Sequence, residues 1–391
     1  MRNLLFVALA CSALACGQAN AGEFSLAGDQ RWIVYSTQDD LEHAIAFARR
    51  FASNDRKGMA MKQADGRFSV VAGPVAAPDP EKLIQDEAAR WYPEPPPPTL
   101  SRGDEFTGKA WQPADPVIAR GEMKEDAPQA ATLAAGPLRI DISPRKGRKR
   151  DSTPTAVAIA KEGKPVFRHV FDDDDYRANA AAFVVRLAPG PGDDQAVFTH
   201  FTGGPHCCTN TIVATADAQG RWRAIDAGYT ERGYDFEDLD GDGAAEMIGL
   251  DEGLLYAFSS YADSNPPPRL KKLVDGTVKD VTFDPAYRRY MRQQLYLMEG
   301  IARPQDWKRN GWLAGWVAMK IIVGEGPDGW SRMLANYDRD DSASIERCRV
   351  KAKVDECPSA KRKFIDAPFP AALRVYLVRH DYPVSDLPPA K

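Results

Sequence analysis

Asp238-Leu239-Asp240-Gly241-Asp242-Gly243-Ala244-Ala245-Glu246 is the most informative stretch of this sequence. Its aspartates stand at alternate positions, so every second side chain can point into one loop, and Gly243 permits a sharp turn. Calcium prefers roughly six to eight oxygen ligands, which such a loop supplies. We therefore predict a calcium loop with five ligands, Asp238, Asp240, Asp242, the backbone carbonyl of Ala244, and Glu246. The alternative interpretation is an acidic surface turn that holds no metal.

The loop is not an EF-hand, because its twelfth position is Gly249, where that motif requires a bidentate glutamate. The following residues, Met247–Leu250, favour a strand rather than a helix. The loop resembles the calcium loops of FG-GAP/VCBS-type β-repeats, in which D-x-D-x-D-G-x-x-(D/E) joins two strands. That resemblance implies a structural calcium ion in a β-domain. The motif occurs once, so we do not expect a full propeller.

Short apolar segments with turn signals between them surround this loop from residue 136 to residue 283. Strands at such regular spacing predict an antiparallel β-domain, either a sandwich or a blade-like sheet. From residue 284 to residue 391 the apolar residues recur at helical spacing, which predicts a C-terminal helical domain. Gly324-Glu325-Gly326-Pro327-Asp328-Gly329 matches a dinucleotide-binding pattern, but its proline removes a phosphate-binding N–H. We interpret it as a connection between two helices.

Residues 22–91 read as strand, helix, strand, strand, helix, with a further strand near residues 106–111. This order predicts a small β-α-β-β-α-β sandwich. The whole chain is therefore expected to be α+β and multidomain. Residues 92–135, which contain Pro95-Pro96-Pro97-Pro98 and an alanine-rich run, are expected to form a linker between the small domain and the β-domain.

The small domain resembles a SPOR (sporulation-related repeat) domain. The resemblance rests on the element order, on the helix sequence LEHAIAFARRF and on the run Gly66-Arg67-Phe68-Ser69-Val70-Val71-Ala72-Gly73-Pro74. It implies binding of peptidoglycan glycan strands lacking stem peptides, across the open face of the sheet. Trp32, Tyr35 and Phe68 are candidates for that face. The competing interpretation places these aromatic side chains in the core.

The N-terminus predicts export. Residues 1–3 carry one arginine, residues 4–15 are nearly all apolar, and Ala19-Asn20-Ala21 is a typical cleavage signal. We expect cleavage after Ala21 and a periplasmic or secreted protein without a transmembrane segment in its mature chain. A lipoprotein anchored through Cys16 is the alternative. Ala13 argues against it, because lipoprotein signals usually have leucine three residues before the cysteine.

Four of the six cysteines remain after this cleavage. An exported chain meets an oxidising compartment, in which disulfides persist. Cys348 and Cys357 would close a short polar loop and are the favoured pair. Cys207 and Cys208 are adjacent, so a bridge between them would be strained. The alternative is that each of them bonds to one member of the distal pair. Gly203-Gly204-Pro205-His206 precedes them, and we interpret this loop as structural rather than catalytic.

The loop "GG-x-HCC-T" followed by "D-x-DGDG-x-x-E" resembles a class of uncharacterised exported bacterial proteins, a resemblance that implies fold and compartment but no activity. The formal charge is −4, from 51 Lys and Arg and 55 Asp and Glu, which argues against a nucleic-acid partner. No catalytic residues stand out in the sequence. We expect a non-catalytic binding protein of the cell envelope, with peptidoglycan glycan strands as its partner. The alternatives are a secreted hydrolase of cell-wall or surface polysaccharide, and a purely structural interaction protein.

Overall fold

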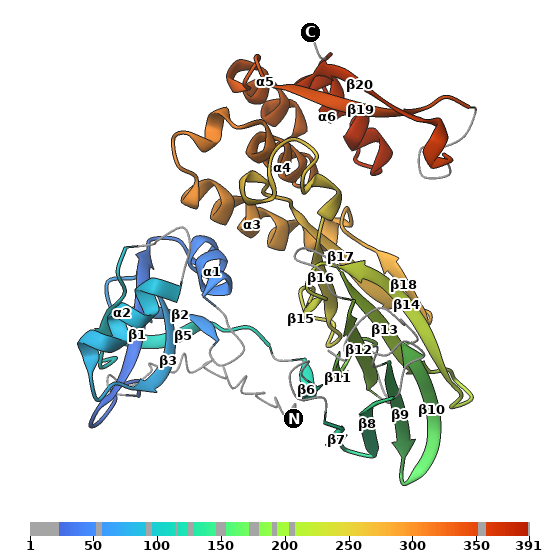
Figure 1. Ribbon diagram of the computed structural model, residues 1–391. Coiled ribbons are helices and arrows are strands. Elements are labelled where there is room, and N and C mark those ends of the chain that lie inside the picture. The colour runs from blue at the N-terminus through green and yellow to red at the C-terminus, as the bar shows by residue number, and fades with distance from the viewer. Residues whose placement is uncertain are drawn as a thin grey trace, which may run out of the picture. The chain divides into compact units, whose positions relative to one another are not determined.

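A computed structural model describes residues 23–51, 57–90, 96–114, 116–123, 129–145, 154–171, 180–189, 194–202, 208–350 and 357–389. The chain divides into two compact units, residues 1–113 and residues 114–391 (Figure 1). Each unit combines antiparallel sheets with helices, so the fold is α+β and multidomain as predicted. Among the described helices, none combines the length and the apolar character that a membrane crossing requires.

The first unit is one five-stranded antiparallel sheet with two helices. Its strands lie in the order β4-β1-β3-β2-β5. Asp40 caps the first helix by accepting a hydrogen bond from the backbone N–H of His43. The elements of this unit are β1 (Gln30–Gln38), α1 (Leu41–Arg50), β2 (Gly58–Gln63), β3 (Phe68–Ala76), α2 (Pro80–Arg90), β4 (Thr99–Ser101) and β5 (Phe106–Trp111).

Both faces of this sheet are covered. Successive side chains of a strand point to opposite faces. Ile33 and Tyr35 pack in the cluster that contains the buried side of α1, and Tyr35 stacks on Phe51 at 3.9 Å between ring centroids. Trp32 packs on the other face with Phe106 and with the N-terminal residue Phe24, whose carbonyl oxygen accepts a 3.0 Å hydrogen bond from Trp32 Nε1.

Three antiparallel sheets build most of the second unit. They have the strand orders β10-β9-β8-β7, β14-β13-β12-β11-β6 and β15-β16-β17-β18. The strands are β6 (Val117–Met123), β7 (Ala131–Ala135), β8 (Leu138–Pro144), β9 (Thr155–Lys161), β10 (Lys164–Phe171), β11 (Ala180–Val185), β12 (Gln195–Phe201), β13 (Thr209–Ala216), β14 (Trp222–Thr230), β15 (Asp235–Glu237), β16 (Glu246–Leu250), β17 (Pro268–Val274) and β18 (Thr277–Asp280).

The β14-β13-β12-β11-β6 sheet is the middle layer. Ala196 and Phe198 of β12 pack in one core with Ile140 of β8, whereas Val197 packs in a second core with Met247 of β16. This alternation explains why β12 and β13 read as almost continuous apolar runs, because both of their faces are buried.

A helical layer packs against the β15-β16-β17-β18 sheet. Its core includes Leu270 of β17 together with the fully buried Trp316 and Trp330. The helices α3 (Arg288–Ile301), α4 (Asn310–Ile322), α5 (Gly326–Asn336) and α6 (Phe369–Arg379) gather at this end of the unit (Figure 1). Every residue of α4 is buried, which explains its lack of a polar face. The glycine-rich stretch 324–329, expected to be a connection between helices, is so only in part, because α5 already begins at Gly326 and residues 323–325 form the connection from α4.

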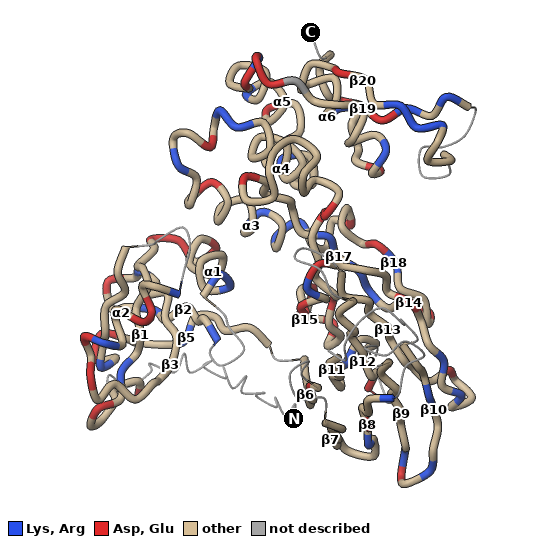
Figure 2. The backbone as a smooth tube through the Cα atoms, in the orientation of Figure 1, with Lys and Arg blue, Asp and Glu red and all other residues tan. Residues whose placement is uncertain are grey.

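Two ranges differ from the sequence-based expectation. Residues 92–135, expected to be a linker, contribute the four strands from β4 to β7, because β4, β5 and β6 find partners distant in the chain and β7 pairs with the following strand β8. The C-terminal domain is not entirely helical. It includes a hairpin of β19 (Ser342–Cys348) and β20 (Arg362–Pro368), along which Lys and Arg residues gather (Figure 2).

A disulfide closes this hairpin. It joins Cys348 and Cys357, with 5.7 Å between their Cα atoms, and is the pair that the sequence favoured. Cys208 is also disulfide-bonded, and because Cys348 and Cys357 bond to each other, neither of them is its partner. Cys207 and the preceding residues 203–206 lie outside the described residues.

Candidate functional site

The aspartate-rich motif forms the loop between β15 and β16. Backbone N–H groups within the loop donate hydrogen bonds to its carboxylates. Asp238 accepts hydrogen bonds from Gly241 and Gly243, at 2.8 and 3.0 Å. Positive φ angles of 79° and 86° at these two glycines allow the chain to turn back on the Asp238 side chain.

The next two aspartates use one oxygen each in the same way. Asp240 Oδ1 accepts a hydrogen bond from the N–H of Asp242, and Asp242 Oδ1 accepts one from the N–H of Ala244. Glu246 Oε2 accepts a 2.8 Å hydrogen bond from the N–H of Leu239, across the mouth of the loop. The loop thus fixes its own carboxylates, and the remaining oxygens of Asp240, Asp242 and Glu246 point to one position.

The ammonium group of Lys272 lies at that point. Its Nζ is 2.7 Å from Asp240 Oδ2, 2.8 Å from Asp242 Oδ2 and 2.8 Å from Glu246 Oε1. Lys272 comes from β17, in which Lys271 pairs with Met247 of β16, and this register places Lys272 beside Glu246 on the same face of the sheet. Three of the five predicted ligands therefore surround a cation that the chain itself provides.

Tyr287 closes the cluster from the helical layer. Its hydroxyl lies 3.1 Å from Asp240 Oδ2 and 3.0 Å from Glu246 Oε1, and its own side chain is buried. Burial raises the pKa of Glu246, which is fully buried, although hydrogen bonding to Lys272 opposes this. Burial alone lowers the pKa of Lys272, but its hydrogen bonds to the three carboxylates outweigh that effect and raise the pKa.

The contacts of Lys272 decide whether the predicted calcium ion fits in this loop. The structure brings oxygens of Asp238, Asp240 and Glu246 within 4.8 Å of one another, and Ala244 is buried in the same loop. However, the Lys272 ammonium lies where the inward oxygens converge, and a divalent cation there would meet a like charge at close range. With Lys272 in this position, the residues do not fit a bound calcium ion.

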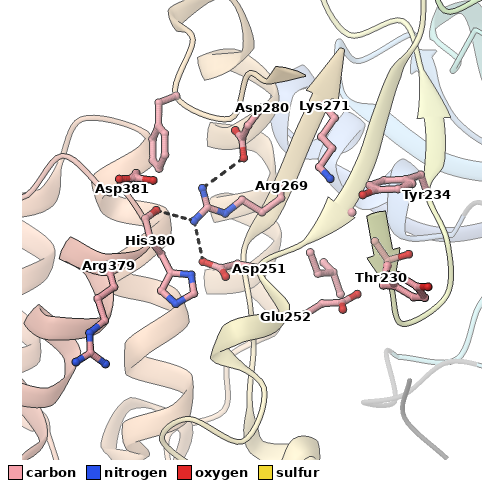
Figure 3. Close-up of a pocket in the computed structure, with 14 residues that line it drawn as sticks. Thr230, Tyr234, Asp251, Glu252, Arg269, Lys271, Asp280, Arg379, His380 and Asp381 are labelled. Carbon is pink, nitrogen blue, oxygen red and sulfur yellow. Dashed lines mark hydrogen bonds and ion pairs between the residues drawn. The ribbon is translucent and has the colours of Figure 1, made fainter. Parts of the chain in front are cut away.

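A cavity of about 510 Å³ lies on the opposite face of β17 (Figure 3). It is bordered by the ends of β14 and β16, by β17 and β18, and by the segment that follows α6. Its lining residues are Tyr229, Thr230, Tyr234, Gly249, Leu250, Asp251, Glu252, Arg269, Lys271, Asp280, Phe283, Arg379, His380 and Asp381.

Asp251 is the buried carboxylate of this pocket, with 4% of its surface exposed. Its Oδ1 accepts a 2.7 Å hydrogen bond from the hydroxyl of Tyr376, and its Oδ2 accepts bonds from the hydroxyl of Tyr382 and from Arg269. Burial near this carboxylate raises the pKa of both tyrosines, so they stay protonated and donate. Both oxygens of Asp251 therefore hold α6 and its following turn in place.

Arg269 lies at the centre of the pocket and bridges its walls (Figure 3). Its Nη2 lies 3.2 Å from Asp251 and donates a 3.0 Å hydrogen bond to the backbone carbonyl of His380, while Nη1 lies 3.8 Å from Asp280. Its guanidinium also lies over the ring of Tyr382, 4.7 Å from the ring centroid. The inner wall is thus a network in which one guanidinium group is shared by the carboxylates of Asp251 and Asp280.

The outer wall carries groups that are less enclosed. Glu252 Oε1 accepts a 2.5 Å hydrogen bond from the N–H of Glu231, and burial raises the pKa of Glu252. Lys271 Nζ donates a 2.7 Å bond to the carbonyl of Ala227 and lies over the Tyr234 ring. Tyr229 is 56% exposed at the edge of the pocket. Charges of both signs and an aromatic ring therefore face the solvent here.

Sequence reasoning missed both Lys272 and the pocket residues. The segment Pro268–Val274 was not expected to be a strand, although the run Leu-Lys-Lys-Leu-Val before Asp275-Gly276 is a hairpin signal. Asp251 and Arg269 have no motif that marks them. In the first unit, the aromatic candidates Trp32 and Tyr35 are buried, and Phe68 packs in the same cluster as Tyr35.

Comparison with known proteins gives relatives without an assigned activity. A family model described as the sll0997 C-terminal domain matches residues 289–381, from α3 to the turn after α6. The chain is 29% identical over 388 residues to the uncharacterized protein y4bJ of Sinorhizobium fredii, covering 97% of this chain and 60% of that protein. It is 35% identical over 191 residues to the probable thylakoid lumen protein sll0997 of Synechocystis, covering 48% of this chain and 56% of that protein.

The chain thus spans less than two thirds of the length of either relative. No solved structure matches it. The matched family domain contains Tyr376, Arg379, His380 and Asp381, whereas Asp251 and Arg269 lie outside it. The pocket therefore lies where the family domain meets the β-sheet that precedes it.

Proposed function

We propose that this protein is an exported, non-catalytic binding protein of the cell envelope, and that its pocket beside Arg269 binds a polyhydroxylated saccharide. One observation carries the proposal. The pocket combines an inner wall whose charges are already matched, Asp251 with Arg269, and an outer wall of polar groups and an exposed tyrosine. Such a surface can bind a ligand through its outer polar groups. Its buried carboxylate, Asp251, is already bonded to Arg269 and is therefore not available as a catalytic acid.

Two observations support export. The sequence predicts a signal peptide over residues 1–21, and one relative is named a probable thylakoid lumen protein, a compartment that lies beyond a membrane. The Cys348–Cys357 disulfide agrees with an oxidising compartment.

The lining of the pocket supports a saccharide. Four acidic residues, Asp251, Glu252, Asp280 and Asp381, lie among three basic ones, Arg269, Lys271 and Arg379, so a strongly charged ligand of either sign would meet repulsion. Hydroxyl groups both donate and accept hydrogen bonds and suit such a mixed surface. An exposed tyrosine ring adds apolar contact area with a polar tip. Peptidoglycan glycan strands are the proposed source of the saccharide.

This proposal places the binding site in the second unit. The SPOR resemblance pointed instead to the aromatic side chains of the first unit. Trp32 is buried beneath Phe24, and Tyr35 stacks on Phe51 and donates a 2.8 Å hydrogen bond to Glu87. Binding through either ring would require part of the first unit to unpack.

Sedimentation with purified sacculi tests the proposal. The mature chain should pellet with sacculi, and Tyr229→Ala should reduce the bound fraction several-fold. Phe364→Ala is the matched control, because Phe364 is another exposed aromatic residue, 66% exposed, on β20 away from the pocket lining. Equal binding by the wild type and Tyr229→Ala would contradict a role for the pocket.

A hydrolase is the second candidate, and one observation favours it. Burial raises the pKa of Glu252 at the pocket, and a glutamate with a raised pKa can act as a general acid. The mature chain should release no soluble fragments from sacculi if the protein only binds. Release that is lost in Glu252→Gln, while sedimentation persists, would establish the hydrolase instead.

A further inference from the structure

We infer that Lys272 is the built-in cation of the Asp238–Glu246 loop, so that this calcium-type motif is held by an ammonium group and does not bind calcium. The inference concerns the opposite face of β17 from the pocket and does not depend on the proposed saccharide. Its basis is the convergence of Asp240, Asp242 and Glu246 on one nitrogen atom.

The hydrogen-bonding capacity of the ammonium group matches its surroundings. A lysine ammonium has three N–H donors. Three carboxylate oxygens lie within 2.8 Å of Lys272 Nζ, one each from Asp240, Asp242 and Glu246. The other oxygen of each carboxylate accepts a backbone N–H of the loop. The inward oxygens are therefore used by the ammonium rather than left for another cation.

The same oxygens would be needed by calcium. Calcium binds oxygens at about 2.3–2.6 Å, close to the 2.7–2.8 Å at which Lys272 Nζ lies. A calcium ion equidistant from Asp240, Asp242 and Glu246 would therefore occupy nearly the same position as the nitrogen. The two cations exclude each other by both volume and charge.

Lys272 is held in this position by the sheet. The pairing of Met247 with Lys271 fixes the side of β17 from which Lys272 projects. Its side chain is 11% exposed, and Tyr287, packed in the helical core, covers the cluster. Lys271, the preceding residue, projects to the opposite face, where its ammonium group donates a hydrogen bond to the carbonyl oxygen of Ala227. The positive charge of Lys272 therefore comes from an inner strand of the sheet, and its side chain is not free to move into solvent.

The experiment measures calcium binding by equilibrium dialysis and the melting temperature in millimolar calcium and in chelator. Wild-type protein should bind no calcium at the loop, and its melting temperature should be the same in both solutions. Lys272→Ala removes the ammonium and leaves the carboxylates, so this variant should bind one calcium ion and melt at a higher temperature in calcium. Lys271→Ala is the matched control and should behave as the wild type does.

Several outcomes would overturn the inference. Calcium bound by the wild type and lost in Asp240→Asn would show that the metal displaces Lys272. A folded Lys272→Ala variant that binds no calcium would show that the loop is not a cation site at all. If Lys272→Ala folds only when calcium is present, the inference is supported. If Lys272→Ala folds in neither solution, the comparison of calcium binding by the wild type and by Asp240→Asn tests the inference by itself.

Discussion

The hydroxyl group of Tyr376 donates a 2.7 Å hydrogen bond to Asp251 Oδ1, and so joins two positions 125 residues apart in the chain. Asp251 follows β16, whereas Tyr376 belongs to α6. Tyr382 and Arg269 bond to the other oxygen of the same carboxylate. One buried side chain therefore connects the β-sheet layer with the last helix of the helical layer, and it also builds the inner wall of the pocket.

Asp251→Ala is expected to destabilise the second unit strongly. The substitution leaves Arg269 and the hydroxyl groups of Tyr376 and Tyr382 without their acceptor, and breaking a buried charged pair from one side costs about 3–5 kcal/mol. Urea unfolding followed by circular dichroism measures the loss. Asp386→Ala, which removes an exposed carboxylate from the segment that follows α6, should change the free energy of unfolding by less than about 0.5 kcal/mol. A small effect of Asp251→Ala would mean that this network contributes little to stability.

Glu252→Gln should make stability less dependent on pH. Burial raises the pKa of Glu252 above its ordinary value of 4.5, so between the two values the folded chain keeps a proton that the unfolded chain has released. Stability therefore falls as pH rises from 4.5 through the folded pKa, and the loss persists at neutral pH. The neutral glutamine does not have this loss.

The pH profile of unfolding midpoints tests this sign. Glu252→Gln should exceed the wild type in stability at pH 7, and the two should converge below pH 4.5, where Glu252 is protonated in both states. Glu105→Gln, at an exposed glutamate, is the control and should give the wild-type profile. A variant that is less stable at neutral pH would show that ionised Glu252 stabilises the fold.

Gly103→Ala should detach the N-terminal segment from the first unit. Gly103 has a φ of 88°, and a Cβ atom there would lie 2.2 Å from the carbonyl oxygen of Phe24 and 2.8 Å from Trp32 Nε1. Gly66→Ala is a matched control, because Gly66 has a φ of 89° with open space around it. Backbone strain alone should cost the control about 1 kcal/mol.

We expect Gly103→Ala to lose about 1–3 kcal/mol more than Gly66→Ala, as overpacking in a tight contact usually does. Limited proteolysis should cut residues 23–31 faster in Gly103→Ala than in the control, because Phe24 can no longer pack over Trp32. Equal cleavage of the two variants would contradict the contact between Phe24 and Gly103.

Replacing both Cys348 and Cys357 by serine should loosen the β19–β20 hairpin. The bridge spans nine residues, and closing a loop of that size in the unfolded chain contributes about 2–3 kcal/mol. Ile345 of β19 is buried in the helical core, so the loss should extend beyond the hairpin. The double variant is preferable to a reducing agent, since Cys208 is also disulfide-bonded. An unchanged unfolding midpoint would contradict this role.

Local patterns in the sequence predicted the elements that local interactions determine. Residues 238–245 form a loop between two strands, as the alternating aspartates and glycines indicated, and Glu246 begins the second strand. The order of the elements in residues 22–91 predicted a β-α-β-β-α arrangement, which the first unit contains. Apolar residues at helical spacing after residue 284 predicted helices, and Trp316 and Trp330 of these helices lie in the core. Each of these features depends on residues a few positions apart.

The features that could not be predicted depend on contacts between residues that are far apart in the chain. Lys272 and Asp240 are 32 residues apart in the chain, and the spacing within the motif does not predict their contact. Residues 92–135 look like a linker in composition, yet β5 adds to an edge of the first sheet and β6 to an edge of a sheet in the second unit. Asp251 acquires its partners only when α6 folds against β17. These relationships belong to topology rather than to local spacing.

The two lysines side by side in β17 also restrict how the chain can fold. Lys272 meets three carboxylates on one face, while Leu273 enters the apolar core on the other. A shift of β17 by one residue in one direction would put Leu273 at the acidic loop and leave the carboxylates unneutralised, whereas a shift in the other direction would put the ammonium group of Lys272 where Leu273 packs with Met247. Either shift is therefore unfavourable, one at the acidic loop and the other in the apolar core. The acidic loop and its lysine thus act as a check on strand register while the protein assembles.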